Sequence, residues 1–374
     1  MSIGSLVAQK LHTLKSGKGI RAQLLRGALG VGGTKALSVG LALITSVLLA
    51  RGLSPSGFGQ YSFVVSVVTM LALPFGPALQ NLLTREVARY HQGQQWSLLR
   101  GLLRRSSQWI LVGAVGLTTI VVTVGGVKGD WSPDNRWTLA AVGVLTLPFL
   151  GLMQLYSGSL RGLRQVVVAQ VPIMIARPGF HILIVGVLSI FGVLSAVHAL
   201  IRLSIVTLGA AALGAWCLQR YRPPMVLQCQ PQYRSVYWGK SLLPFSVLAA
   251  AGSLNKELGV LALGWLRTDG EVAAFRVAQQ GAMLVPLALT VINLVIAPQI
   301  TRYYQNGDWD QLRRLMKRSA AAALTLALPI GLPLIFAGGW IVELVFGETY
   351  RQTSTVPLAL LAGAQLVNVG MGSV

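Results

Sequence analysis

Charge is scarce in this chain of 374 residues: Asp, Glu, Lys and Arg together make up 11% of it, whereas a soluble domain carries about 25%. Hydrophobic residues make up 53%, which excludes both an ordinary soluble domain and a disordered chain. Apolar runs of spanning length recur from end to end. The sequence therefore predicts an all-α fold, a polytopic membrane protein whose backbone polar groups are satisfied within helices.

Acidic residues and cysteines are few. The chain has 10 Asp and Glu against 31 Lys and Arg, a net charge of +21, and only two cysteines. These are Cys217 and Cys229, and they imply no disulfide framework. Since no cluster with metal-ligand spacing occurs, we expect no metal and no cofactor, and no catalytic group is assigned. Residues 1–26 are basic and lack the apolar core of a signal peptide, so we expect a cytoplasmic or interfacial segment there.

Ten apolar stretches have the length of a membrane span. They lie at about 27–50, 60–83, 107–127, 137–160, 168–191, 194–218, 241–266, 272–298, 319–342 and 354–374. With the N-terminus in the cytoplasm, the inner segments hold 21 Lys and Arg and the outer loops hold six, among which we count Arg276. Because cytoplasmic loops retain positive charge, this distribution predicts a cytoplasmic N-terminus. It also explains the basic character without nucleic acid as a partner.

Two basic segments 213 residues apart resemble each other. Residues 88–106 read ARYHQGQQWSLLRGLLRRS and residues 301–319 read TRYYQNGDWDQLRRLMKRS, so Trp96 matches Trp309. The shift contains six spans, which predicts two parallel repeats that form two bundles with a cavity between them. We assign 27–237 to the first bundle and 238–374 to the second. The second holds only four spans and ends in an apolar run, so we expect a fragment that lacks two helices.

Four cations lie deep inside predicted spans: Lys35, Arg177, Arg202 and Lys256. A charge at mid-span costs about 2.5 to 3.5 kcal/mol on insertion scales, which suggests a function. We expect them to line a central cavity that binds an anionic substrate, since Arg and Lys both recognise phosphate. The alternative for the arginines is that they cap backbone carbonyls freed by nearby prolines, which for Arg177 are Pro172 and Pro178.

Two histidines share helix faces with these arginines. Arg177 and His181 are four residues apart, as are His198 and Arg202. Together with Glu257, the two histidines are the candidate titrating groups for coupling to an ion. Glu257 is the one acid at comparable depth, and a local ion pair with Lys256 is the alternative role of these two neighbours.

Several stretches resemble one family. The segment LLARGLSPSGFGQYSF at 48–63 is similar to polysaccharide biosynthesis proteins that flip lipid-linked oligosaccharides, such as O-antigen precursors of lipopolysaccharide, within the multidrug/oligosaccharidyl-lipid/polysaccharide (MOP) exporter superfamily. Stretches at 241–266, 297–319 and 328–368 resemble the family in the same order. The resemblance implies a V-shaped alternating-access transporter of the multidrug and toxic compound extrusion (MATE) type with a cationic cavity, which this chain meets with its four deep cations.

The resemblance and the cations together predict a non-enzymatic flippase in the bacterial inner membrane. Its expected substrate is a polyprenyl-pyrophosphate-linked oligosaccharide, moved from the cytoplasmic to the outer leaflet, and its further expected partners are membrane lipids and proteins of polysaccharide assembly. A MATE-type drug or metabolite antiporter is the alternative, but cationic drugs require buried carboxylates. A glycan polymerase or ligase is a third interpretation. Its candidate acids, which have no His partner, are Asp130, Asp134, Asp269, Glu271, Glu343 and Glu348.

Overall fold

The computed structural model describes residues 20–128, 131–132, 135–188 and 195–372, and within them it is helical with no strand. Most of the predicted N-terminal segment, together with Asp130 and Asp134, lies outside the described residues. The first-repeat helices are α2 (Ile20–Gly52), α3 (Pro55–Leu71), α4 (Pro77–Gln92), α5 (Trp96–Lys128), α6 (Arg136–Val144), α7 (Leu147–Gly162), α8 (Val166–Gln170), η1 (Val171–Ala176), α9 (Arg177–Leu188) and α10 (Ala196–Tyr221). After the short α11 (Met225–Gln228) come α12 (Ser235–Leu266), α13 (Asp269–Ala282), α14 (Leu287–Gln305), α15 (Trp309–Phe336), α16 (Gly338–Phe346), η2 (Glu348–Tyr350) and α17 (Arg351–Met371).

Among the described residues, nine helices are long and apolar enough to cross a membrane, against the ten expected. The missing one is the stretch predicted at 60–83. It is divided between α3 and α4 by a turn at 72–76, and neither helix alone reaches the length of a span. Pro74 lies in this turn and Pro77 begins α4. Proline removes a backbone donor, so the break follows from the sequence.

The repeat predicted from the sequence reappears in the helix boundaries. Trp96 begins α5 and Trp309 begins α15, 213 residues later, and the ends of α4 and α14 differ by the same number. The break between α3 and α4 also recurs between α13 and α14, where Pro286 precedes the second helix. The two stretches therefore fold as repeats of one unit.

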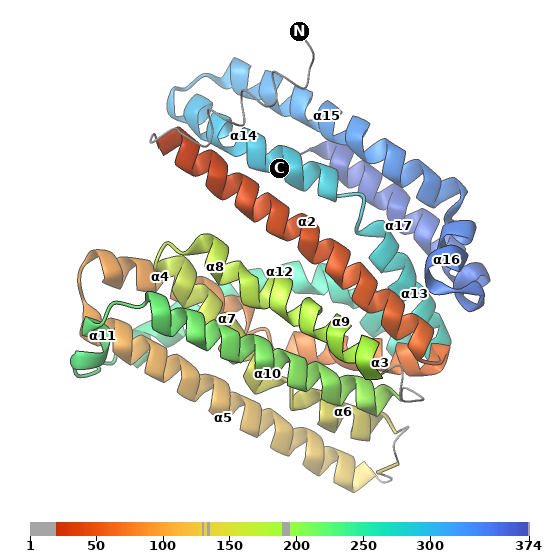
Figure 1. The fold of residues 1–374 in the computed structure, drawn as a ribbon, viewed down its shortest axis with the longest axis horizontal. Helices are drawn as coiled ribbons and strands as arrows, with labels where there is room; N and C mark the ends of the chain where they lie inside the picture. The colour runs from red at the N-terminus through yellow and green to blue at the C-terminus, as the bar shows by residue number, and fades with distance from the viewer. Residues whose placement is uncertain (1–19, 129–130, 133–134, 189–194, 373–374) are drawn as a thin grey trace.

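The first helix of the second repeat, α12, packs mainly against the first repeat, and the first helix of the first repeat, α2, lies between the two repeats. In Figure 1, α2 runs between one group of helices, α13 to α17, and a second group that contains α3 to α10 and also α12. α12 packs on α4 and α3, and α2 in turn contacts α14 and α13 as well as α8, η1 and α9 of its own repeat. The domain boundary expected at 237/238 thus separates α12 in sequence from the helices that it contacts most.

The two repeats meet closely at the predicted outer ends of α3 and α13. Asp269, the first residue of α13, accepts hydrogen bonds from Gln60 Nε2 at 3.1 Å and from Arg136 Nη2 at 3.0 Å. Gly59 makes this approach possible, since a Cβ atom there would lie 1.8 Å from the Asp269 carbonyl oxygen. Nearby, Arg51 donates to the Val345 and Leu344 carbonyls at 2.9 and 2.6 Å. These contacts join the repeats beside the central helices.

Candidate functional site

Arg177 lies directly after an irregular turn. Residues Val171–Ala176, which include Pro172, form a π-helix, and Arg177 begins the α-helix that follows. Such π-turns occur often at functional sites. Within the described part of the chain, the Arg177 guanidinium makes no hydrogen bond to a carbonyl, so the capping alternative for this arginine has no support there. Its charge is left for another partner.

The Arg177 side chain lines a cavity of about 210 Å³ between α2, α3, α9 and α10. His181, one turn further along α9, lines the same cavity, as Tyr61 of α3 does. Polar groups of α2 complete the wall with Ser38 and Thr45. His181 is buried, and its Nε2 atom has no hydrogen-bond partner among the described residues. The i and i+4 spacing thus places a cation and an unpartnered imidazole on one cavity wall.

A second polar cluster lies where α3, α12 and α13 meet. Arg276 Nη1 lies 3.2 Å from Glu257 Oε2, and the two side chains are only 15% and 14% exposed. Ser66 donates to the same carboxylate oxygen at 2.6 Å, and Arg276 donates to Gln279 at 2.9 Å. Glu257 therefore forms its ion pair with Arg276 of the next helix and not with its neighbour Lys256.

Arg276 is the site residue that the sequence analysis missed. Charge counting places it in an outer loop, but it is a residue of α13, within the candidate span Asp269–Asn293 that α13 forms together with the start of α14. Two features of the sequence indicate it. Arg276 lies within the apolar stretch at 272–298, and Glu257 needs a cationic partner, for which Lys256 is only one candidate. Charge counting places Arg276 in the loop because it lies near the outer end of the apolar stretch. In the structure α13 begins before this stretch, at Asp269, so Arg276 lies inside the helix.

Tyr61, which is buried and lines the cavity beside Arg177, lies within electrostatic range of both Arg177 and Arg276. Lys35 of α2 and Lys256 of α12 are also close enough to interact with each other. Both lysines are exposed, whereas Arg177 and the Glu257–Arg276 pair are at least half-buried, so the cations of α2 and α12 lie nearer the surface of the described chain than those of α9 and α13.

The two residues paired on α10, His198 and Arg202, lie in different surroundings. His198 is exposed at the start of the helix, where its Nδ1 lies 2.7 Å from the Ser195 hydroxyl that caps the helix. Of the described residues, the cavity wall includes neither His198 nor Arg202. Arg202 acts electrostatically on His181, and its Nη1 atom is buried without a partner in the described chain. Arg202 is thus near the cavity cluster, whereas His198 belongs to a helix cap.

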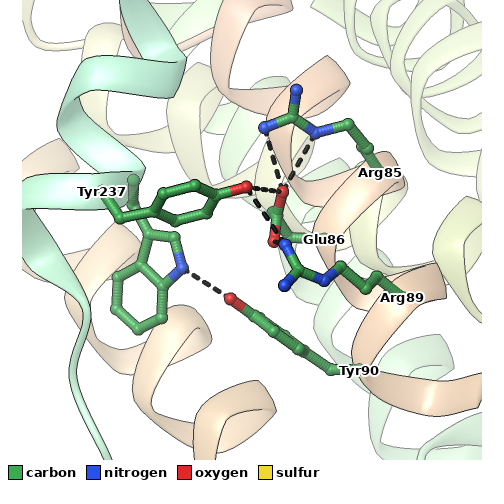
Figure 2. A network of polar contacts seen from close by, with 6 residues as sticks. Arg85, Glu86, Arg89, Tyr90 and Tyr237 are labelled. Atoms are coloured by element: carbon green, nitrogen blue, oxygen red, sulfur yellow. Dashed lines mark hydrogen bonds and ion pairs between the residues drawn. The ribbon is translucent and has the colours of Figure 1, made fainter. Parts of the chain in front are cut away.

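A third polar network holds α12 on α4 (Figure 2). Glu86 of α4 is 1% exposed and accepts hydrogen bonds from Arg85 Nε at 3.0 Å and from the Tyr237 hydroxyl at 3.2 Å. Arg89 Nη1 lies 3.6 Å from the second carboxylate oxygen and donates to Tyr237 at 3.1 Å. Burial raises the pKa of the neighbouring Tyr90 hydroxyl, which accepts a hydrogen bond from an indole of α12. The network holds α12 on α4 at the predicted cytoplasmic end of both helices.

Comparison with known proteins gives one family and one fold. The family model described as "Polysaccharide biosynthesis protein" matches residues 24–304. The comparison with curated proteins gives no match.

Among solved structures, the inward-facing conformation of a multidrug resistance MATE family transporter of the MOP superfamily has a TM-score of 0.65 and 14% identity, over 89% of this chain and 81% of that one. The MATE multidrug transporter DinF-BH gives 0.56 and 15%, over 93% and 83%. An outward-facing MATE transporter of the MOP superfamily gives 0.56 and 16%, over 96% and 84%. At these identities the likeness establishes the fold.

Proposed function

We propose a function from one premise: the chain belongs to the polysaccharide biosynthesis protein family. It has the fold of MATE transporters and is a multi-pass membrane transporter of the MOP type. Its substrate, in our proposal, is a polyprenyl-pyrophosphate-linked oligosaccharide for cell-surface polysaccharides such as O-antigen. The protein flips it from the cytoplasmic to the outer leaflet of the bacterial inner membrane, with its own N-terminus in the cytoplasm.

The observation that supports this substrate is the unbalanced charge in the interior. Arg177 lines the cavity without an ion-pair partner among the described residues, whereas the charge of Arg276 is balanced by Glu257. A pyrophosphate group offers several anionic oxygens, which guanidinium groups bind in a bidentate manner. We assign Arg177 to the head group, with Lys35, Lys256 and Arg202 as the further cations of the proposal.

The membrane potential drives such a substrate outward. An anion that leaves a negative cytoplasm gains about 2.3 kcal/mol per charge at 100 mV, so a head group with two charges gains roughly 4 to 5 kcal/mol. The cavity has to release the anion once it reaches the outer leaflet. Glu257 and His181 are the groups whose protonation state would alter the positive charge around it, which makes them the candidates for coupling.

A drug antiporter is the second candidate, because the structural neighbours include multidrug transporters. A cationic drug needs a free carboxylate in the membrane. Glu257 is already paired with Arg276, which favours the anionic substrate.

Three of the six outer acids suit an enzyme poorly. Asp269 and Glu343 form ion pairs with Arg136 and Arg351, and Glu271 forms the capping box of α13 with Thr268. Each is engaged in structure, whereas acid-base chemistry needs a group free to reach the substrate.

The test is transport in proteoliposomes that contain polyprenyl-diphosphate-linked oligosaccharide. Flipping is measured as the fraction of glycan that becomes accessible to an added glycosidase on the far side. We expect Arg177→Gln to lower the rate roughly tenfold or more, since loss of a charge-assisted contact costs about 1.5 to 3 kcal/mol. Arg313→Gln, an exposed arginine of α15, is the matched control and should transport normally.

Transport of a cationic dye, with no flipping of the lipid, would assign the protein to the antiporters. A rate that Arg177→Gln and Arg313→Gln lower equally would remove the cavity from the proposal.

A further inference from the structure

A groove of about 600 Å³ lies on the first bundle between α4, α5 and α12, away from the cationic interior. Its walls are apolar: Phe75 and Leu79 on one side, Trp109 and Val112 of α5 on another, and Leu242 of α12. Val112 is 72% exposed, so the groove opens toward the bilayer. An apolar groove that faces the bilayer can bind a hydrocarbon chain.

The groove is built by the local sequence. The turn at 72–76 directs Phe75 toward α5, and a Cβ atom at Gly113 would lie 2.1 Å from the Phe75 ring. Glycine at 113 therefore lets the ring lie against the helix and form the inner end of the groove.

Arg105 lies at the other end of the groove. Its Nε donates to the Ser235 hydroxyl at 2.8 Å and its Nη1 to Gln108 at 3.2 Å, while the guanidinium lies 5.7 Å from the centre of the Tyr233 ring. These neutral partners hold the guanidinium in place, and in the described chain it has no carboxylate partner. Its charge is fixed, uncompensated and accessible from the groove.

The depth of Arg105 suits a lipid head group. At about 1.5 Å per residue, the 33 residues of α5 extend about 50 Å, which is about 20 Å longer than the hydrocarbon core. The basic first turns therefore lie at the membrane surface, and the apolar part that begins at Trp109 lies inside. From Arg105 to Gly113 the groove follows about 12 Å of helix.

We propose that this groove binds an anionic phospholipid of the cytoplasmic leaflet, with its phosphate on Arg105 and one acyl chain along Phe75, Trp109 and Val112. The charge of Arg105 selects an anionic head group, and the apolar walls select a chain. Because α12 belongs to the second repeat and α4 and α5 to the first, the lipid contacts both repeats where they join. The site is independent of the molecule that the central cavity carries.

Trp109 provides the measurement. The full chain is reconstituted in phosphatidylcholine vesicles that contain increasing fractions of brominated phosphatidylglycerol, or of brominated phosphatidylcholine as the neutral lipid. Bromine quenches nearby tryptophan fluorescence, and the difference between the wild type and Trp109→Phe isolates the groove. We expect the groove to prefer phosphatidylglycerol roughly fivefold, as one cation near an anionic surface predicts.

Five variants, two of them controls, test the two parts of the site. Arg105→Gln should abolish the preference, and Arg105→Lys should keep part of it. Arg104→Gln, one residue away and exposed, is the control and should keep it fully. Val112→Phe should reduce Trp109 quenching by both lipids, whereas Val127→Phe, 87% exposed on the same helix, should not.

Equal quenching by the two lipids in the wild type, or an unchanged preference in Arg105→Gln, would overturn the proposal. So would displacement of the brominated lipid by polyprenyl diphosphate at lower fractions than by unlabelled phosphatidylglycerol, since the groove would then serve the chain of the transported lipid. Tests of flipping through Arg177 are separate, so either proposal can fail alone.

Discussion

The indole N–H of Trp238 donates a hydrogen bond of 2.9 Å to the hydroxyl of Tyr90, and both side chains are fully buried. Trp238 belongs to the first helix of the second repeat and Tyr90 to α4 of the first. The positions that match them under the 213-residue shift are Leu25 and Tyr303, so the other repeat cannot form this bond. This bond therefore holds α12 on the first repeat, whereas α2 is held on the second repeat by different contacts, from Arg51 to the Leu344 and Val345 carbonyls.

Removal of this indole should destabilise the whole protein. Trp238→Phe leaves the Tyr90 hydroxyl buried without its donor, and an unsatisfied buried polar group costs about 1 to 3 kcal/mol. Thermal unfolding in detergent should show a lower Tm, with Trp340→Phe as the control because Trp340 is 64% exposed. Equal Tm values for the two variants would mean that the hydrogen bond contributes nothing.

Neutralising Glu86 should loosen α12. In Glu86→Gln the two arginines lose their common carboxylate, but because they are about half exposed we expect a loss of only about 1 to 2 kcal/mol. Hydrogen exchange should become faster in α4 and α12 in particular. The control is Glu343→Gln, whose ion pair with Arg351 is more exposed and should contribute under about 1 kcal/mol. Uniform acceleration along the chain would contradict a local role.

The ion pair of Glu257 and Arg276 should show strong coupling. Each single variant, Glu257→Gln or Arg276→Gln, leaves a charge in the membrane interior without its partner, whereas the double variant removes both. We expect a coupling energy of about 1 to 3 kcal/mol in a double-mutant cycle followed by thermal unfolding. The cycle for Glu257 and Lys256→Gln is the control. A larger coupling there would restore the local pair expected from the sequence.

Gly59 should control the contact between the repeats. In Gly59→Ala the new methyl group meets the Asp269 backbone, so α3 and α13 have to separate, at a cost of roughly 1 to 3 kcal/mol. Gly270→Ala, across the same contact, has open space around its Cβ and is the matched control. Spin labels at Val127 of α5 and Trp340 of α16, which are both exposed, should report a longer distance in Gly59→Ala alone. An unchanged distance would show that the contact adapts without movement.

The spans and the repeat could be predicted because they depend on local properties. A helix in lipid needs about 20 apolar residues, and duplication leaves Trp96 and Trp309 at matched positions. The pairing of Arg177 with His181 on one face also follows from helical spacing, and the structure places both on the cavity wall. Whether these residues bind substrate stays a prediction.

Tertiary partners could not be predicted in the same way. α12 is apolar on all sides, so its sequence does not indicate that it packs on α4 of the other repeat. Arg276 found its carboxylate on a different helix, where spacing along one helix carries no information. His198 shares a helix face with Arg202, yet Ser195 engages it at the cap, because a free helix terminus competes for polar side chains.

The contacts of α2 with the second repeat also determine the order in which the protein can assemble during synthesis. α2 is translated first and packs most extensively on α9 of its own repeat, but Leu287, where α14 of the second repeat begins, follows Gly52 by 235 residues. At about 5 to 20 residues per second, the ribosome needs roughly 10 to 50 s to supply that helix. During this interval the side of α2 that later contacts the second repeat must face lipid or the insertion machinery. This side can pack only after the second repeat has entered the membrane.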